Sequence, residues 1–246
     1  MDVFDFGPQT FGQLNAADYD LHHDPGNTEA AVERIAALAA GGRVLEFAIG
    51  TGRIALPLAA RGIPVTGLEA SPEMVEKLRE KPGGEAIEVV MGDMAAVTVP
   101  GPFDVAILVF NTLFNVLTQD GQVRCFENAA ASLAPGGLFV IEAFVPEITR
   151  FHDGQCVRVN RIGADTAWLE AITHDPVAQR LDMQRMRITA EGTRLVPLAL
   201  RYAWPAEIDL MARVAGMRLA HRWADWQMAP FTPTSRSHVS VYEKPA

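Results

Sequence analysis

The sequence predicts an α/β protein with a mainly parallel sheet and a second, antiparallel sheet inserted late in the chain. The first observation is a strand, glycine turn and helix pattern over residues 43–62. The second is the alternation of apolar runs with helix-like segments up to residue 144. The third is a succession of four strand-like runs, without helices, within residues 147–204. We expect one domain over residues 1–246 that carries this insertion.

Length, charge and cysteine content narrow the class of protein. The chain has 246 residues, 49% of them hydrophobic, and a formal net charge of -9. This charge disfavours nucleic acid or an anionic membrane as the main partner, since both reward a basic face. The acidic start and the lack of a long apolar run predict a cytoplasmic protein. Cys125 and Cys156 fit reduced structural thiols, and no Cys/His spacing predicts a metal site.

The turn Gly50-Thr51-Gly52 organises the first half of the chain. Both glycines can take a positive φ and allow a ligand close to the backbone, while the following helix offers unpaired N–H groups. Glu46, at the end of the preceding strand, suits an ammonium group and would repel a pyrophosphate. Residues 50–55 also fit the dinucleotide fingerprint G-x-G-x-x-G/A, with alanine last. Residues 46–52 also resemble a glycine-rich motif of S-adenosylmethionine-dependent methyltransferases, so NAD(P) and S-adenosylmethionine compete for this loop.

Two further carboxylates follow predicted strands. Glu69 ends the apolar run 63–68, roughly 20 residues after the glycine turn, where a carboxylate accepts hydrogen bonds from ribose hydroxyls. Both competing cofactors carry this ribose, so Glu69 does not choose between them. Asp93 lies in Gly92-Asp93-Met94, directly after a third strand-like run at residues 86–91. Dinucleotide dehydrogenases do not usually carry this pattern here, and a turn cap is its alternative role.

These motifs, in this order, resemble class I S-adenosylmethionine-dependent methyltransferases. Residues 46–52 resemble the family's first motif, with Ala48 in place of a glycine, and Asp93 resembles the residue that accepts from the adenine amine. Pro135-Gly136-Gly137, expected to separate a helix from the fifth strand, is a further feature. The resemblance covers residues 30–144. It implies a seven-stranded doubly wound sheet, six strands parallel and the last antiparallel, and S-adenosylhomocysteine as the product.

The same resemblance implies a set of cofactor contacts at the strand ends. Arg53 could pair with the cofactor carboxylate through a bidentate contact, or lie exposed on its helix. Asn111 is polar at an apolar strand end, where buried polarity needs partners. The expected cofactor-binding residues are Glu46, Ala48, Gly50, Gly52, Arg53, Glu69, Ala70, Met74, Asp93, Met94, Phe110 and Asn111.

The sequence defines the residues around the methyl acceptor less closely than those around the cofactor. Residues 111–115 should lie beside the transferable methyl group, and they lack the Asn/Asp-Pro-Pro-Tyr pattern of nucleobase methyltransferases. Tyr19 resembles an active-site cover in related enzymes or is a surface anchor. Glu142 could orient an amine or make a core hydrogen bond, and His152 could reach the pocket rim or be solvated. These three are the candidate catalytic residues, and the candidate substrate contacts are Phe114, Asn115 and Trp168.

The insertion resembles, at a weak level, small-molecule N-methyltransferases that act on glycine or on nucleotide-linked amino sugars. We expect it to lie over the carboxyl ends of the core strands, as a lid on the acceptor or as a dimer element. The expected activity is methyl transfer to a nitrogen or oxygen atom of a small molecule. Two alternatives stay open: an NAD(P)-dependent oxidoreductase, which leaves Glu46 and Asp93 without roles, and a non-catalytic S-adenosylmethionine-binding scaffold.

Overall fold

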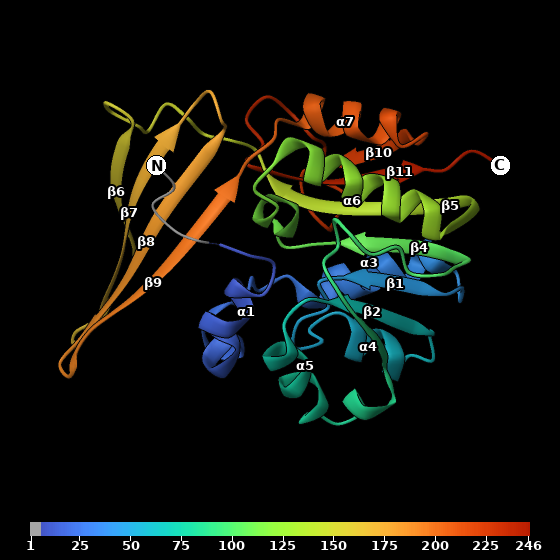
Figure 1. The fold of residues 1–246 in the computed structure, drawn as a ribbon, viewed down its shortest axis with the longest axis horizontal. Helices are drawn as coiled ribbons and strands as arrows, with labels where there is room; N and C mark the ends of the chain where they lie inside the picture. Colours follow the sequence, from blue (N-terminus) through green and yellow to red (C-terminus); the bar gives the residue numbers. More distant parts are fainter. Residues whose placement is uncertain (1–5) are drawn as a thin grey trace.

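The computed structural model describes residues 6–246, and its larger sheet has seven strands (Figure 1). Their spatial order is β10-β11-β5-β4-β1-β2-β3. Strands β1 to β5 run parallel to one another, whereas β11 is antiparallel to both β5 and β10. The predicted fold class is therefore confirmed. The strands are β1 (Val44–Phe47), β2 (Val65–Glu69), β3 (Glu88–Met91), β4 (Phe103–Leu108), β5 (Leu133–Phe144), β10 (Arg218–Trp223) and β11 (Ser237–Glu243).

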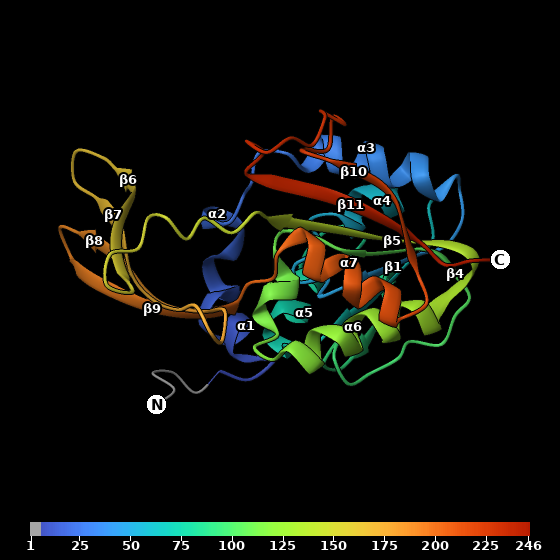
Figure 2. The ribbon, with the colours of Figure 1, turned by 90° about the horizontal axis from the view of Figure 1, so that it is seen from above.

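Helices cover both faces of this sheet, so its central strands are buried on both sides (Figure 2). On one face, α3 (Thr28–Ala39) and α4 (Ala55–Ala60) pack on β1 and β4 through side chains such as Ile35 and Leu58. On the other, α6 (Gln119–Ser132) and α7 (Pro205–Val214) pack through Phe126 and Ile208. Helix α5 (Pro72–Arg79) begins as predicted, with Ser71 accepting from the Met74 N–H. No helix in residues 6–246 is long and apolar enough to cross a membrane.

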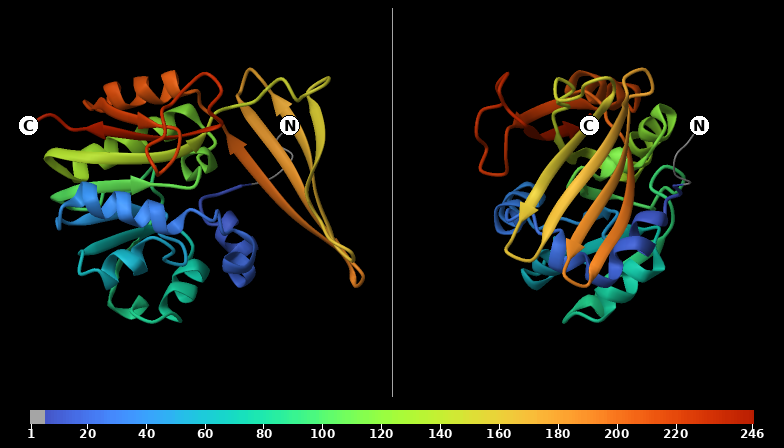
Figure 3. Two further views of the ribbon diagram at one scale, coloured as in Figure 1. Left: turned by 180° about the vertical axis from the view of Figure 1, so that it is seen from behind. Right: turned by 90° about the vertical axis from the view of Figure 1, so that its left-hand side faces the viewer.

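A second sheet of four antiparallel strands is inserted between β5 and α7. Its strands, in spatial order, are β6 (Gln155–Ile162), β7 (Ala167–Asp175), β8 (Arg180–Thr189) and β9 (Gly192–Arg201). Ile172, Leu181 and Leu200, near one end of the sheet, join the main hydrophobic core. The rest extends past the carboxyl ends of the core strands and stands apart from the core (Figure 3). The predicted antiparallel arrangement is thus present.

The N-terminal segment fills the space between the two sheets (Figure 1). It contains α1 (Thr10–Asn15), a short 3-10 helix η1 (Ala16–Asp18) and α2 (Tyr19–His22). The sequence predicts only a short helix over residues 16–23, and α1 is an addition to it. The helix α1 packs on α5 at Gly12, where a Cβ atom would lie 2.2 Å from Ser71 Oγ. This close approach depends on a residue without a side chain.

Two strand boundaries differ from the expected ones. Strand β4 ends at Leu108 rather than Phe110, because Phe110 and Asn111 take left-handed conformations with φ of 59° and 65°. Strand β5 begins at Leu133 and includes Pro135-Gly136-Gly137, which was expected to lie outside it. The Gly136 N–H donates to Lys244 O, beyond the end of β11, so this turn is held at the sheet's margin. Helix α6 ends at Ser132, where Leu133 takes an extended conformation, so these three residues do not separate the helix from the strand as expected.

Candidate active site

A cavity of about 750 Å³ lies where the carboxyl ends of the core strands meet the inserted sheet. Its floor comes from the predicted cofactor motifs, and its roof from the inner face of β7, β8 and β9. The N-terminal segment closes one side. The lining includes Ala48, Gly50, Glu69, Asp93 and Met94 in the floor, Glu170, Met183, Arg185 and Leu198 in the roof, and Phe11, Tyr19 and His23 at the side.

The glycine loop exposes backbone to the cavity floor. Ala48, Gly50 and Gly52 all have positive φ, at 52°, 57° and 82°. Ala48 therefore adopts the conformation that glycine favours at this place in the family motif, and it lines the cavity together with Gly50. Gly52 does not line it; a Cβ atom there would lie 2.4 Å from Leu78 Cδ1. Gly50 thus shapes the ligand surface, while Gly52 allows the loop to pack on α5.

Glu69 joins the glycine loop to the end of β2. Its carboxylate accepts from the backbone N–H groups of Gly50 (2.8 Å), Ala70 (3.0 Å) and Ser71 (2.9 Å). Burial raises the pKa of this carboxyl, and the three N–H donors oppose that rise. Oε1 accepts two of these N–H groups, whereas Oε2 accepts one and keeps a second lone pair for a ribose hydroxyl. Glu69 therefore organises the loop and also faces the cavity.

Glu46 is a buried carboxylate at the end of β1 with one unsatisfied atom. Its Oε2 makes no hydrogen bond with the described residues, and burial raises its pKa to about 8, against the opposing charge of Arg53. An unpaired buried oxygen fits the ammonium of a cofactor's methionine part. Arg53 instead donates to Thr28 Oγ1 and lies over the Phe110 ring, 5.3 Å from its centroid. Neither side chain lines the cavity, so the cofactor contacts expected for Glu46 and Arg53 stay predictions.

Asp93 and Met94 form the far end of the floor. Asp93 Oδ1 accepts from the Ala95 N–H at 2.9 Å, which fixes the turn and orients the carboxylate. The side chains of Ala70 and Met74 line the same cavity. A carboxylate acceptor beside apolar side chains suits an adenine ring and its exocyclic amine. Asp93 and Met94 thus line the cavity as expected, and their contact with adenine stays a prediction.

Residues after β4 line the cavity between these two ends. Asn111 Oδ1 accepts from the Phe144 N–H at 2.6 Å, which leaves its amide N–H groups for other partners. Asn115 lines the cavity as well, whereas Phe114 is fully buried and packs on Phe144 with ring centroids 4.7 Å apart. Phe114, proposed from the sequence as a substrate contact, is therefore a core residue.

The N-terminal segment contributes an aromatic pair, Tyr19 and His23, to the cavity wall. Tyr19 stacks on His23 with ring centroids 4.7 Å apart, and burial raises the pKa of Tyr19 to about 12. His23 Nε2 lies 3.1 Å from Arg185 Nη1, and its Nδ1 lies 3.3 Å from Tyr19 O. Burial and the Arg185 charge lower the pKa of His23 to about 4. His23 is therefore neutral, with Nε2 accepting from Arg185 and Nδ1 donating to the backbone.

Two candidate catalytic residues do not face the cavity. Glu142 accepts from the Phe110 N–H, Asn27 Nδ2 and Trp226 Nε1, all within 2.9 Å, so it holds the segment after β4 in place. His152 has a side chain that is 95% exposed and pairs with its neighbour Asp153. The catalytic roles expected for both do not fit these positions. The alternatives, a core hydrogen bond for Glu142 and a solvated loop for His152, fit them.

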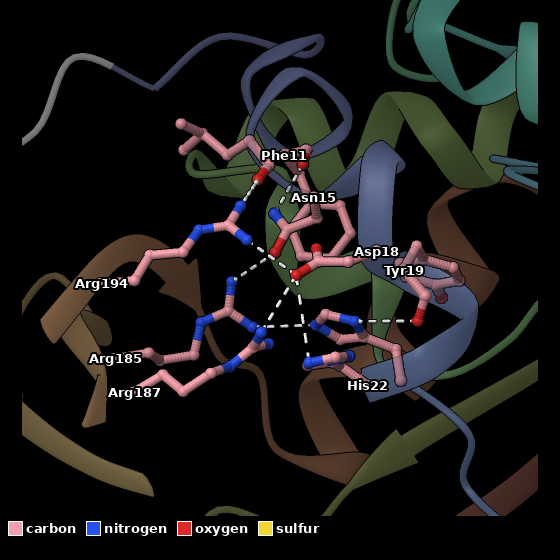
Figure 4. A network of polar contacts seen from close by, with 10 residues as sticks. Phe11, Asn15, Asp18, Tyr19, His22, Arg185, Arg187 and Arg194 are labelled. Atoms are coloured by element: carbon pink, nitrogen blue, oxygen red, sulfur yellow. Dashed lines mark hydrogen bonds and ion pairs between the residues drawn. The ribbon is translucent and has the colours of Figure 1, made fainter. Parts of the chain in front are cut away.

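Trp168 lies on the inner face of the inserted sheet but outside the cavity lining. Its ring stacks on His22 at 4.9 Å, and Arg187 lies over it at 4.5 Å. Asp18, beside this pair, accepts from Arg187 at 3.2 Å and from Arg194 at 2.7 Å (Figure 4). The expected substrate contact at Trp168 is thus part of the connection between the inserted sheet and the N-terminal segment.

The sequence analysis did not identify several of the residues that line the cavity. Arg158, Glu170 and Arg185 stand opposite one another on β6, β7 and β8. Arg158 Nε donates to Glu170 Oε2 at 2.6 Å, and Glu170 is buried. Alternation along β7 and β8 places these charges on the same face as Ile172 and Met183. The sequence shows this alternation, but it does not show which face of the sheet meets the core.

The strand order and the floor of this cavity together define a class I S-adenosylmethionine-dependent methyltransferase site. Residues 44–137 match the family model described as a methyltransferase domain. The chain is 39% identical to the CcbJ methyltransferase from Streptomyces caelestis, with a TM-score of 0.92 over 98% of this chain and 100% of that one. It belongs to the class I S-adenosylmethionine-dependent methyltransferases.

Two other relatives are more distant. The cypemycin N-terminal methyltransferase of a Streptomyces species is 28% identical over 209 residues, which cover 83% of this chain and 84% of that protein. The S-adenosylmethionine-bound amino pentose methyltransferase CalS10 from Micromonospora echinaspora shares the fold, with a TM-score of 0.68 and 24% identity over 98% and 99% of the two chains. The chain is thus an enzyme that uses S-adenosylmethionine, and the NAD(P)-dependent oxidoreductase and the non-catalytic scaffold are set aside.

Proposed function

We propose that the enzyme methylates an amine nitrogen of a small molecule held between the core sheet and the inserted sheet. The observation that carries this proposal is the continuity of the cavity, which runs from Glu69 and Asp93 to Met183 and Leu198. Methyl transfer from a sulfonium is an in-line displacement, so the protein mainly has to align the acceptor and exclude water. In this proposal the inserted sheet acts as the lid.

The chemistry of the roof supports a compact acceptor with an apolar body. Leu181, Met183, Leu198 and Leu200 line the roof, and Phe151 and Ile148 lie at its edge. The paired charges of Arg158 and Glu170 are the polar groups within this apolar surface. Small-molecule sites commonly combine apolar walls with a few placed polar groups. A cavity of about 750 Å³ that must also hold the cofactor leaves room for a small acceptor rather than a folded protein.

The histidine and the tyrosine that the N-terminal segment contributes to the lining favour an amine over a hydroxyl acceptor. A hydroxyl acceptor usually needs a general base, whereas an amine only has to be neutral when it attacks. Among the described lining residues the histidine is His23, whose pKa is lowered to about 4 and whose two nitrogens are occupied. The Tyr19 phenol, with a pKa raised to about 12, stays protonated. It would serve as a hydrogen-bond donor and a wall for the methyl group.

The name of one relative supports nitrogen as the atom that is methylated. The cypemycin N-terminal methyltransferase acts, by its name, on a terminal amine. In our proposal Asn111 and Asn115 orient the incoming amine, because both line the cavity between the floor and the roof. Asn111 is held by the Phe144 N–H, which fixes the direction of its amide.

A methyl-transfer screen tests the proposal. The purified enzyme is incubated with S-adenosylmethionine labelled in its methyl group and with matched pairs of small amines and the corresponding alcohols. We expect label in the amines and a rate that rises with pH as each amine loses its proton. Label confined to alcohols, or a rate that does not follow the amine pKa, would contradict the choice of nitrogen.

A substitution in the roof tests the location of the acceptor. Leu198→Trp would fill the space beneath the inserted sheet, so we expect methyl transfer to fall at least about tenfold while S-adenosylhomocysteine binds as before. Val214→Trp on α7, 66% exposed and outside the cavity, is the control. Normal turnover in Leu198→Trp would place the acceptor elsewhere.

A further inference from the structure

The inserted sheet has an inverted distribution of polar and apolar side chains. An antiparallel sheet over a core normally turns apolar residues inward and polar residues toward water. Here the inward face carries five arginines in the part of the sheet that extends away from the core. They lie on strands β6, β8 and β9 and are Arg158, Arg161, Arg185, Arg187 and Arg194. The outward face is apolar instead.

The outward face consists of three adjacent cross-strand rows, which we call the outer apolar face. Strand pairing defines the rows, because residues opposite one another project to the same side. The rows are Val157–Ala171–Gln184–Pro197, Val159–Leu169–Met186–Leu195 and Ile162–Ala167–Ile188–Thr193. None of these twelve residues is charged. The sheet stands clear of the core on this side (Figure 3).

Exposure on this face is high for apolar side chains. Val157 is 69% exposed, Ile162 75% and Leu195 58%, and Val159 and Ile188 are also exposed. These five side chains present on the order of 500 Å² of apolar surface, as much as the largest patch on a typical monomer. With the half-buried Leu169, Met186 and Pro197, the face approaches the roughly 800 Å² that each partner contributes to a standard interface.

We propose that the outer apolar face is the contact between two copies of this chain, packed sheet on sheet about a twofold axis. An uncharged face is self-complementary, and it lets two chains of net charge -9 meet without like charges in contact.

The charges around the face argue against an anionic membrane as its occupant. The two hairpin tips beside it carry Asp165 and Glu191 next to Arg161 and Arg194, so the charges are mixed, whereas a membrane-binding rim is basic. A dimer of this kind sets the two inserted sheets back to back. Each cavity then opens on the opposite side of its own sheet, and the outer apolar face is removed from water. The dimer expected from the sequence would use this surface.

The mass in solution tests the proposal. By light scattering at tens of micromolar, the full chain should have about twice its 26.7 kDa mass. Val159→Asp and Leu195→Asp each place two carboxylates in the contact by symmetry, and we expect each to weaken dimerisation at least about tenfold. Val177→Asp is the matched control, because Val177 is 93% exposed in the β7–β8 turn, outside the face.

Binding of S-adenosylhomocysteine verifies that each variant is folded, since the cofactor motifs lie in the core sheet. A wild-type chain that remains a monomer at this concentration overturns the proposal. So does a dimer that survives in both Asp variants as it does in Val177→Asp, because the contact would then lie on another surface. A dimer lost in the two face variants and kept in the control supports it.

Discussion

The cofactor floor and the acceptor roof of the cavity are built by different kinds of interaction. In the floor, carboxylates are held by backbone N–H groups from nearby turns: Glu69 accepts three of them and Asp93 one. In the roof and the N-terminal segment, long side chains hold one another, as in Asp18 with Arg194 and Glu170 with Arg158. Asp18 and Arg194 are 176 positions apart in the chain.

This difference predicts how each region responds to mutation. Backbone donors around a buried carboxylate have no alternative partner, so removing the carboxylate leaves them unsatisfied. Partly exposed ion pairs can be replaced by water at small cost, and they contribute little to stability. Substitutions in the floor should therefore reduce folding and cofactor affinity strongly, whereas substitutions in the roof should change local order and acceptor use.

The largest effect is expected for Glu69→Ala. Three backbone N–H groups lose their acceptor, and an unsatisfied donor costs about 1–3 kcal/mol, so we expect a loss of about 3–5 kcal/mol in the free energy of unfolding. Affinity for S-adenosylhomocysteine should fall more than about 100-fold. Urea unfolding and calorimetry measure the two quantities. Glu85→Ala, an exposed carboxylate, is the control. A Glu69→Ala protein as stable as this control would break the comparison.

The next effect is a pH dependence that comes from Glu46. Its pKa is about 8 in the folded protein, above the ordinary value of 4.5, so between these values the folded state holds a proton that the unfolded state lacks. Stability should therefore fall as pH rises through this window, by up to about 1.4 kcal/mol per pH unit, and level off above it. Urea unfolding across the window measures the slope.

Glu46→Gln should flatten this slope, while the exposed Glu85→Gln should not. An ammonium placed beside Glu46 favours its charged form, so S-adenosylhomocysteine binding at neutral pH should release up to one proton. Calorimetry in buffers of different ionisation heat detects that release. Equal proton release by wild type and Glu46→Gln would show that Glu46 does not meet the cofactor.

A smaller effect is expected at the adenine end. Asp93→Ala removes a carboxylate that orients its own turn through the Ala95 N–H and lines the cavity. We expect a loss of about 1–3 kcal/mol in binding, on the order of tenfold or more in affinity for S-adenosylhomocysteine. Calorimetry measures it, with the unfolding midpoint as the check on folding. Unchanged affinity in a folded variant would leave Asp93 as a turn residue alone.

The smallest effect on stability is expected in the N-terminal segment. Asp18→Asn removes ion pairs with Arg187 and Arg194, whose side chains are partly exposed, so we expect a loss of about 1 kcal/mol or less. Hydrogen exchange over residues 10–23 should become faster, while affinity for S-adenosylhomocysteine changes less than about threefold. Asp24→Asn in the exposed turn that follows is the control. A large loss of cofactor affinity would mean that this segment holds the cofactor as firmly as the floor does.

The sequence by itself determined the core fold and most of the residues that line the floor of the cavity. The Gly50 turn, Glu69 and Asp93 each lie within a few residues of the strand end that positions them, so their roles depend on local order in the chain. The carboxyl ends of parallel strands meet at one edge, which brings these residues together in any sheet of this kind. The four strands of the insertion were likewise visible from their alternation and turn residues.

Only the tertiary structure shows which residues form the acceptor side of the cavity. Glu142 and His152 were both candidates from the sequence, but only the fold shows that Glu142 accepts from Trp226 and that His152 points to solvent. The helix α1, the Tyr19–His23 pair and Arg185 meet across more than 160 residues of chain. Which face of an inserted sheet turns inward depends on how it leaves the core. Contacts between distant side chains carry no local pattern, so the floor could be predicted and the roof could not.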